Sequence, residues 1–204
     1  MRKNPMNRKQ DWDERYKTGD LPWDTGRSDF NLHEIIAKSR IHPCKALEIG
    51  CGTGNNATWL ARHGFSITGI DVSGTAIQQA VKRAARAGVE CSFFALDFMK
   101  EKLDGGPFGF IFDRGCFHSF DLAKERTRYA KAVHSYLKKD GLWLTLVGST
   151  DEPPRYPGPP QRSASDIVTA VEPYFQILLL YASHFDSDMR KPPKAWACLM
   201  RKRS

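Results

Sequence analysis

An alternation of short apolar runs with helical patterns is the feature of this sequence that most constrains its fold. Runs with the composition of β-strands occupy residues 45–50, 66–71, 91–97, 107–113, 142–148, 174–185 and 194–201. Stretches with helical spacing separate most of these runs, but none separates the last two. The alternation predicts an α/β fold in which helices cover both faces of one seven-stranded sheet. The sheet should be mostly parallel, with the last strand antiparallel.

The predicted helices begin and end at recognisable residues. One helix should begin after the N-cap Ser73 and end at Gly88. Its buried face is formed by apolar residues at helical spacing, namely Ile77, Ala80, Val81 and Ala84. Further helices are predicted over residues 55–63, over 122–139 and from Ser163 or Ser165 to about 172. The Pro- and Gly-rich residues 151–162 predict a loop.

Acidic residues lie at or near the ends of the first four predicted strands. They are Glu48, Asp71, Asp97 and Asp113. The carboxyl ends of parallel strands meet at one edge of a sheet, and ligands of open α/β sheets bind at that edge. Four acids there predict a ligand that presents hydroxyl groups, amines or positive charge.

A glycine-rich loop, LEIGCGTGNNA, joins the first predicted strand to its helix over residues 47–57. Gly50, Gly52 and Gly54 alternate in this loop, which allows positive φ angles and a close approach of the backbone to a ligand. Asp71 follows Gly54 by seventeen residues, at the end of the second strand. A strand, a glycine loop, a helix and a downstream acid predict a site for a ligand that contains a ribose.

Two cofactors fit this loop. Gly52, Gly54 and Ala57 match the G-x-G-x-x-A pattern of dinucleotide sites. Glu48 discriminates between the two, because a carboxylate would repel a pyrophosphate but attract the ammonium and sulfonium groups of S-adenosylmethionine. Such an attraction contributes about 1–4 kcal/mol near a surface, which is enough to favour S-adenosylmethionine.

The loop and its surroundings resemble those of the class I S-adenosylmethionine-dependent methyltransferases, which implies a Rossmann-like fold. LEIGCGTG resembles their first motif, GID their second-strand acid and ALDF their adenine site, and the resemblance covers residues 45–148. The N-terminal pattern narrows it to the thiopurine and thiol S-methyltransferases and their tellurite-methylating relatives. That pattern consists of Trp12, Tyr16, Gly19, Pro22, Trp23, Asp24 and Gly26. Asp113, Arg114 and Gly115 strengthen the comparison, whereas residues 150–204 match more loosely.

The resemblance implies roles for individual residues. The cofactor site would comprise Trp12, Tyr16, Trp23, Glu48, Gly50, Cys51, Gly52, Gly54, Asp71, Val72, Asp97, Phe98 and Asp113. In this assignment Asp71 accepts from the ribose hydroxyls, Asp97 accepts from the adenine amino group, and the three aromatic residues cover the cofactor. Aromatic faces attract a sulfonium or ammonium. The alternative for the aromatic residues is simple packing against the sheet edge, and the alternative for either acid is a helix N-cap.

The acceptor side of the site would follow the fourth strand. Arg114, Phe117 and Arg162 are the predicted substrate-binding residues, and Arg114 could instead pair with Asp113 or another acid. His118 is the predicted general base, because an imidazole titrates near neutral pH. Its alternative is a structural histidine. No metal is expected at the site.

Composition and cysteine content predict a single reduced domain. A chain of 204 residues that is 41% hydrophobic and 26% charged is typical of one globular domain. We divide it into a cofactor-covering segment over 1–43, a cofactor-binding core over 44–148 and a substrate-side part over 149–204. Five scattered cysteines without a C-x-x-C pair favour free thiols. With no apolar run of membrane length and no apolar stretch after the basic N-terminus, a cytoplasmic monomer is expected.

The positive charge is concentrated near the two ends. Seven cationic residues lie among the first ten and last four residues, and without them the net charge of +8 falls to +1. A nucleic-acid groove requires clustered cations on the folded surface, so nucleic acid is not the expected partner. The leading function is methyl transfer to a small molecule, with a thiol or another soft S, Se or Te atom favoured by the resemblance. A small-molecule O- or N-methyltransferase, a non-catalytic S-adenosylmethionine-binding module and an RNA-associated module remain as alternatives.

Overall fold

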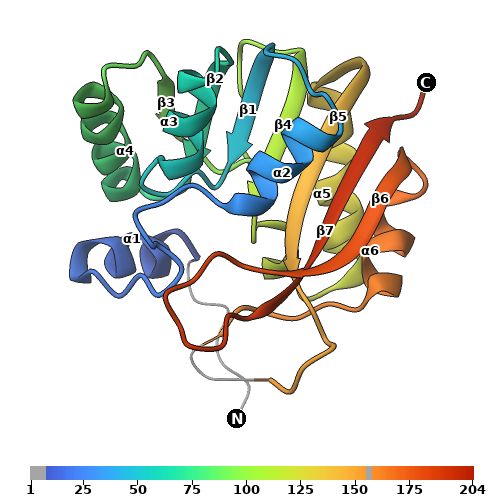
Figure 1. The fold of residues 1–204 in the computed structure, drawn as a ribbon. Helices are drawn as coiled ribbons and strands as arrows, with labels where there is room; N and C mark the ends of the chain where they lie inside the picture. Colours follow the sequence, from blue (N-terminus) through green and yellow to red (C-terminus); the bar gives the residue numbers. More distant parts are fainter. Residues whose placement is uncertain (1–7, 155–157) are drawn as a thin grey trace.

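The structure of the protein, a computed structural model that describes residues 8–154 and 158–204, contains one seven-stranded sheet between two layers of helices (Figure 1). The strands are β1 (Lys45–Ile49), β2 (Ser66–Asp71), β3 (Ser92–Ala95), β4 (Phe108–Arg114), β5 (Leu137–Gly148), β6 (Phe175–His184) and β7 (Lys194–Lys202). The α-helices are α1 (Arg8–Thr18), α2 (Phe30–Lys38), α3 (Asn55–Arg62), α4 (Gly74–Ala87), α5 (Ala123–Tyr136) and α6 (Ala164–Val171). A short 3₁₀-helix, η1, covers Phe117–Ser119.

The sheet has the strand order β3-β2-β1-β4-β5-β7-β6. β7 lies between β5 and β6 and is antiparallel to both, whereas the pairs among β1 to β5 are parallel. The predicted mostly parallel sheet with an antiparallel last strand is therefore confirmed. The chain order reverses between β1 and β4, so the crevice expected of such a sheet lies at the ends of these two strands.

Each face of the sheet carries its own apolar core. On one face, α2 and α3 contribute Leu32, Ile35, Ala57 and Leu60 to a buried cluster with residues of β1, β4 and β7. On the other face, α5 and α6 contribute Tyr129, Val133, Ile167 and Val171 to a second cluster. The two layers are visible on either side of the sheet in Figure 1.

Helix α4 has the predicted ends but a different buried face. The Ser73 side chain accepts from the backbone N–H of Ala76, and Gly88 ends the helix in the left-handed region, as expected. The buried residues are the alanines 76, 80 and 84, while Val81 is 51% exposed and the prediction for it was wrong. Small side chains are needed on this face because a Cβ on Gly54 would lie 2.9 Å from the Cβ of Ala80.

Strand β5 begins earlier than its sequence indicates. The helix predicted to reach residue 139 ends at Tyr136, and Leu137 already pairs with Phe108 of β4. Leu137 is buried at 1% exposure and has extended backbone angles, because it fills the core rather than continuing the helix. Lys138, Lys139 and Gly141 therefore belong to a strand that bulges near Asp140, where φ is +58°.

Two features near the ends of the chain differ from expectation. Helices α1 and α2 were not predicted; Asp29 is the N-cap of α2, and its side chain accepts from the N–H of Asn31. The C-terminal cations do not form a free tail. Lys202 lies in β7 and donates to the carbonyl of Leu137, and Arg203 pairs with Glu172. The N-terminal cations Arg2 and Lys3 lie outside the described residues.

Among the described residues, no helix has the length and apolar character needed to cross a membrane.

Candidate active site

The glycine loop between β1 and α3 has the conformation that its sequence predicts. Gly50, Gly52 and Gly54 have φ angles of +67°, +53° and +80°, a region that side chains with a Cβ disfavour. A Cβ on Gly50 would overlap the thiol of Cys116, and a Cβ on Gly52 would lie 2.8 Å from the hydroxyl of Tyr16. Glycine is therefore needed at both positions so that these side chains can pack against the loop backbone, and Cys51 within the loop is buried.

Asp71 at the end of β2 faces the glycine loop. One oxygen of its carboxylate accepts from the N–H of Gly52 at 3.0 Å and the other from the N–H of Ser73 at 2.9 Å. Burial raises the pKa of Asp71 to about 6, against the lowering effect of these backbone donors. The loop and the second strand are thus tied together at the position predicted for a ribose, with Val72 half-buried next to it.

Glu48 is buried in β1 with one oxygen engaged. Oε1 accepts from the side-chain amide of Asn56 at 2.9 Å. Oε2 is buried and has no hydrogen-bond partner among the described residues. Burial raises the pKa of Glu48 to about 8, so the group is mostly protonated at neutral pH unless a cation lies beside it. The expected repulsion of a pyrophosphate assumed that Glu48 is charged. Glu48 becomes charged at neutral pH only when a cation of the ligand lies beside it.

Residues 12–29 form part of the predicted cofactor-covering region 1–43 and are called the covering segment from here on. They lie across the carboxyl edge of the sheet (Figure 1). Tyr16 is buried, with its hydroxyl over Gly52, and burial raises its pKa above the usual range. Trp12 and Trp23 pack edge to face at 5.4 Å, and the guanidinium of Arg15 lies 4.1 Å from the ring centre of Trp23. The three aromatic residues named from the sequence therefore form one cluster, which contacts the loop through Tyr16.

Two carboxylates of the covering segment attach it to helix N-termini. Asp24 accepts from the Thr53 hydroxyl at 2.6 Å and from the Asn55 amide at 2.7 Å, at the start of α3. Asp13 accepts from the Ser73 hydroxyl at 2.7 Å and from the N–H of Thr75 at 3.0 Å, at the start of α4. Negative charge is stabilised at helix N-termini.

The carboxylate of Asp13 has its pKa lowered, first by the Ser73 bond. Its role, like that of Asp24, was not predicted, although Asp24 belongs to the N-terminal pattern. Asp13 and Asp24 accept hydrogen bonds from residues that are distant in the sequence and come close only in the folded protein.

Asp97 lies in a turn beyond β3. One oxygen accepts from the N–H of Met99, and the other forms an ion pair with Lys100 at 2.9 Å. The carboxylate thus stabilises a local turn, and the helix N-cap considered as its alternative is not found, since the described residues between β3 and β4 contain no helix. The side chain of Phe98 is buried against Tyr129 and Tyr136, which leaves only its backbone for an adenine.

Asp113 is fully buried and organises the segment after β4. Its oxygens accept from the N–H groups of Cys116 and Phe117 and from the indole of Trp143. Burial raises its pKa to about 6. With these donors already bound and no exposed surface, Asp113 is better placed to shape the crevice than to contact a cofactor.

Arg114 connects three parts of the chain instead of pointing to a free acceptor site. It donates to Asp29 Oδ2 at 2.7 Å, to the carbonyl of Trp23 at 3.1 Å and to the carbonyl of Asp186 at 2.7 Å. Its guanidinium also lies 5.1 Å from the ring centre of Phe185. The pairing with an acid that the sequence left open is therefore with Asp29, which is 85 residues away in the sequence.

His118 has an environment that argues against the base expected from the sequence. Its Nδ1 accepts from the backbone N–H of Gly148 at 2.9 Å, which puts the proton of the neutral ring on Nε2. Burial, followed by the charges of Arg162 and Arg114, lowers its pKa to about 3. The ring therefore stays neutral and has no free lone pair in this arrangement. Phe117 is likewise enclosed, at 0% exposure.

Arg162 holds the segment that contains His118 and Phe120. Its guanidinium donates to the carbonyls of His118 and Phe120 and forms an ion pair with Asp121 at 2.8 Å. The arginine thus holds residues 118–121 in place and is not directed at an acceptor. Residues 155–157 of the predicted loop before it lie outside the described part of the chain.

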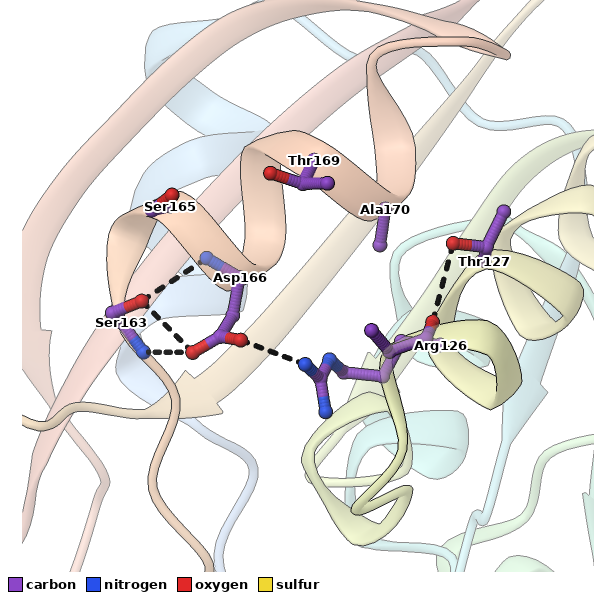
Figure 2. Close-up of a pocket in the computed structure, with 8 residues that line it drawn as sticks. Arg126, Thr127, Ser163, Ser165, Asp166, Thr169 and Ala170 are labelled. Atoms are coloured by element: carbon purple, nitrogen blue, oxygen red, sulfur yellow. Dashed lines mark hydrogen bonds and ion pairs between the residues drawn. The ribbon is translucent and has the colours of Figure 1, made fainter.

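Two hollows flank this region. A cavity of about 120 Å³ lies between the N-termini of α5 and α6, where Arg126 pairs with Asp166 and Ser163 caps α6 (Figure 2). None of its lining residues belongs to the glycine loop or the covering segment. A groove of about 400 Å³ lies between residues 21–25 and 187–189, and Asp24 lines it. Of the two, only the groove adjoins the loop, through the contacts of Asp24.

Comparisons with known proteins agree with this architecture. The thiopurine S-methyltransferase family matches residues 7–198. A probable thiol methyltransferase 2 of Arabidopsis thaliana is 28% identical over 73% of this chain and 65% of its own length. A 2-heptyl-1-hydroxyquinolin-4(1H)-one methyltransferase of Mycobacteroides abscessus is 28% identical over 76% of this chain and 69% of its own.

A solved structure described as "Conversion of a Disulfide Bond into a Thioacetal Group during Echinomycin Biosynthesis" has a TM-score of 0.82. It is 23% identical and the match covers 96% of this chain and 92% of that one, which supports the fold. The match to the Arabidopsis protein covers just under two thirds of that protein's length, so its acceptor is not carried over.

The resemblance drawn from the glycine loop and the N-terminal pattern is confirmed, as are the methyltransferase class and S-adenosylmethionine as its donor. Because the family match spans almost the whole sequence, the chain belongs to the thiopurine S-methyltransferase family.

Proposed function

We propose that this protein transfers the methyl group of S-adenosylmethionine to a soft atom of a small molecule, namely the sulfur of a thiol, with selenium and tellurium as related acceptors. The observation that carries the proposal is the loop over residues 50–54 at the reversal in strand order. It has Asp71 on one side, the buried carboxyl group of Glu48 below it and the aromatic covering segment above it.

The residues of the crevice suit the methyl donor. Gly50, Cys51 and Gly52 offer backbone groups, and Asp71 offers a carboxylate for the ribose hydroxyls. Oε2 of Glu48, buried and without a described partner, is an acceptor for an ammonium group. When bound, S-adenosylmethionine supplies an electrophilic methyl group on a positively charged sulfur, so the protein needs mainly to orient the two reactants and exclude water.

The covering segment and the adenine end complete the proposed donor site. Tyr16 and Trp23 would exclude water from the crevice, since the Tyr16 ring lies against Gly52 and the Trp23 ring packs on Tyr16. Val72 and the backbone of Phe98 would contact the adenine, and Asp97 would reach it if Lys100 released the carboxylate.

The acceptor side favours a group that ionises without help. His118 is neutral and donates from Nε2 in the arrangement described above, so it offers no base to an alcohol or an amine. A thiol has a pKa near 8.5 and provides thiolate at neutral pH without a catalytic base. The name of the Arabidopsis relative supports the same acceptor class.

The alternative is methyl transfer to oxygen or nitrogen of a small metabolite, which the name of the Mycobacteroides relative supports. A role without catalysis has no such support. For a role at an RNA the support is a ribosomal RNA small subunit methyltransferase C of Alcanivorax borkumensis, which is 32% identical but matches over 50% of this chain and 32% of its own length. The five free cysteines suit a reducing compartment, so we propose a cytoplasmic location. We also propose that the protein acts as a monomer.

A methyl-transfer assay with a panel of thiols, selenite, tellurite, phenols and amines tests the proposal. We expect turnover with at least one thiol or chalcogen oxyanion, and loss of that turnover in Asp71→Ala. Turnover restricted to phenols or amines would favour the alternative. Binding of S-adenosylmethionine without turnover of any acceptor would contradict catalysis on these acceptor classes.

A further inference from the structure

Asn56, which lies just inside α3, joins the crevice to the covering segment. Its side-chain amide donates to Glu48 Oε1 at 2.9 Å, and its amide oxygen accepts from the backbone N–H of Asp29 at 2.8 Å. All three residues are buried, at 7%, 1% and 1% exposure. An amide side chain can donate at one end and accept at the other, which neither a carboxylate nor an apolar group can do.

Asp29 extends this connection into two other segments. Its Oδ2 accepts from Arg114 Nε at 2.7 Å and from the N–H of Asp186 at 3.2 Å. Arg114 in turn donates to the carbonyls of Trp23 and Asp186. A continuous hydrogen-bonded path therefore runs from Glu48 to Trp23 in the covering segment and to the turn between β6 and β7.

The end of the path at Glu48 is the part that a ligand can change. Oε2 is buried and has no partner among the described residues, so an ammonium group placed there would meet an uncompensated acceptor. A cation at Oε2 also holds the group as a carboxylate. Hydrogen bonds to a charged acceptor are roughly twice as strong as neutral ones, so the bond from Asn56 strengthens when the cation is present.

We propose that Asn56 is a positioning residue, which transmits the binding of the donor's ammonium group at Glu48 to Asp29 and Arg114 and thereby fixes the covering segment over the crevice. This inference rests on the proposed function, since it assumes that the methyl donor binds at the glycine loop. The covering segment then closes in response to the amino-acid part of the donor and not to its adenosine part.

Hydrogen exchange of the backbone amides of residues 12–29 tests the proposal with two probes. S-adenosylhomocysteine carries the ammonium group, and 5′-methylthioadenosine lacks it. In the wild-type protein, saturating S-adenosylhomocysteine should slow exchange in this segment by about tenfold, an ordinary coupling between two sites, while 5′-methylthioadenosine should leave it nearly unchanged.

Asn56→Ala should still bind S-adenosylhomocysteine but lose the slowing of exchange in the covering segment. Asn31→Ala is the matched control, because Asn31 is also buried and also bonded to Asp29. Its backbone N–H and its side-chain amide donate to Oδ1 of Asp29, away from Glu48. It should keep the slowing. Glu48→Gln changes the path from its other end without creating a cavity, and it should lose the slowing even if Asn56→Ala fails to fold.

The outcomes separate the two claims. Equal slowing by the two probes, or slowing that persists in Glu48→Gln or in a folded Asn56→Ala, would overturn the role of Asn56 while leaving the donor site intact. Failure of the wild-type protein to bind S-adenosylhomocysteine would overturn the proposed function, and this inference with it.

Discussion

The donor side and the acceptor side of the crevice are built in different ways. On the donor side, the contacts around the glycine loop join residues close in sequence: Asn56 reaches Glu48 over 8 positions, and Gly52 reaches Asp71 over 19. On the acceptor side, Arg114 reaches Asp29 and Asp186 over 85 and 72 positions, and Arg162 reaches His118 over 44.

The donor loop is therefore formed by local backbone geometry, whereas the acceptor side is formed by tertiary contacts. The glycine loop needs only a strand, a turn with positive φ and a helix. The acceptor side needs Asp29, the end of β4 and the β6–β7 turn to meet, and Arg114 holds them together. Changes on the acceptor side should therefore affect folding first, and changes on the donor side should affect ligand binding first.

The largest effect is expected for Arg114→Ala. The variant leaves Asp29, whose side chain is 0% exposed, without its ion-pair partner, and removing one member of a buried pair costs about 3–5 kcal/mol of folding free energy. In a domain of this size the melting temperature should fall by roughly 6–20 °C. Thermal unfolding measures it. Adding Asp29→Asn should recover part of the lost stability. If Arg114→Ala alone is as stable as the wild type, then Arg114 does not hold the acceptor side together.

Asp71→Ala should show the opposite pattern, with a large effect on the ligand. Hydrogen bonds to a charged group contribute about 1.5–3 kcal/mol each, so affinity for S-adenosylhomocysteine should fall about 10- to 100-fold or more. Calorimetric titration of the folded variant gives this value. Asp71→Asn, which keeps an acceptor for the Gly52 N–H, is the control for loop geometry. Unchanged affinity in both variants would contradict the ribose role.

Glu48→Gln should change the pH dependence of stability. The pKa of Glu48 rises from 4.5 to about 8 on folding, so the folded state binds more protons and the wild-type protein loses stability as pH increases through this window. Between pH 6.5 and 8 the other raised carboxyl groups, with pKa values of about 6, contribute little. Urea unfolding across this range should show a decline for the wild type and a flatter line for the variant. Parallel lines would mean that Glu48 is already charged.

The smallest effect is expected for His118→Gln. If the imidazole is structural, kcat/KM for a thiol should follow thiol ionisation in both proteins, with a fall in kcat of less than about tenfold, smaller than the loss of a typical general base. pH–rate profiles with one thiol acceptor decide this. A limb near pH 6–7 that is present in the wild type and absent in the variant would restore the base role.

The sequence predicts the elements around the glycine loop because each of their signals is local. Ser73 and Gly88 mark the ends of α4 through contacts within one helical turn, and the three loop glycines are needed wherever a strand turns sharply into a helix. The alternation of strands and helices likewise predicts a mostly parallel sheet, without any information on which strands pair.

The rest depends on partners that are distant in sequence. Asp113 lies near the end of β4 and Phe117 follows that strand, in the pattern of a binding site, but Trp143 on the adjacent strand encloses both of them. Leu137 belongs to β5 because Phe108 is its partner, which no helical periodicity reveals. Asn56 and Asp29 gain their meaning only when α2 packs beside α3, although the capping role of Asp29 is a signal that could have indicated α2.

The most direct test of the account is a calorimetric titration of the wild-type protein with S-adenosylmethionine and, separately, with NAD, repeated with Gly50→Val, which would place a side chain against Cys116. We expect saturable heat with S-adenosylmethionine, none with NAD, and none with either ligand for the variant. Tighter binding of NAD than of S-adenosylmethionine, abolished by the same substitution, would contradict it.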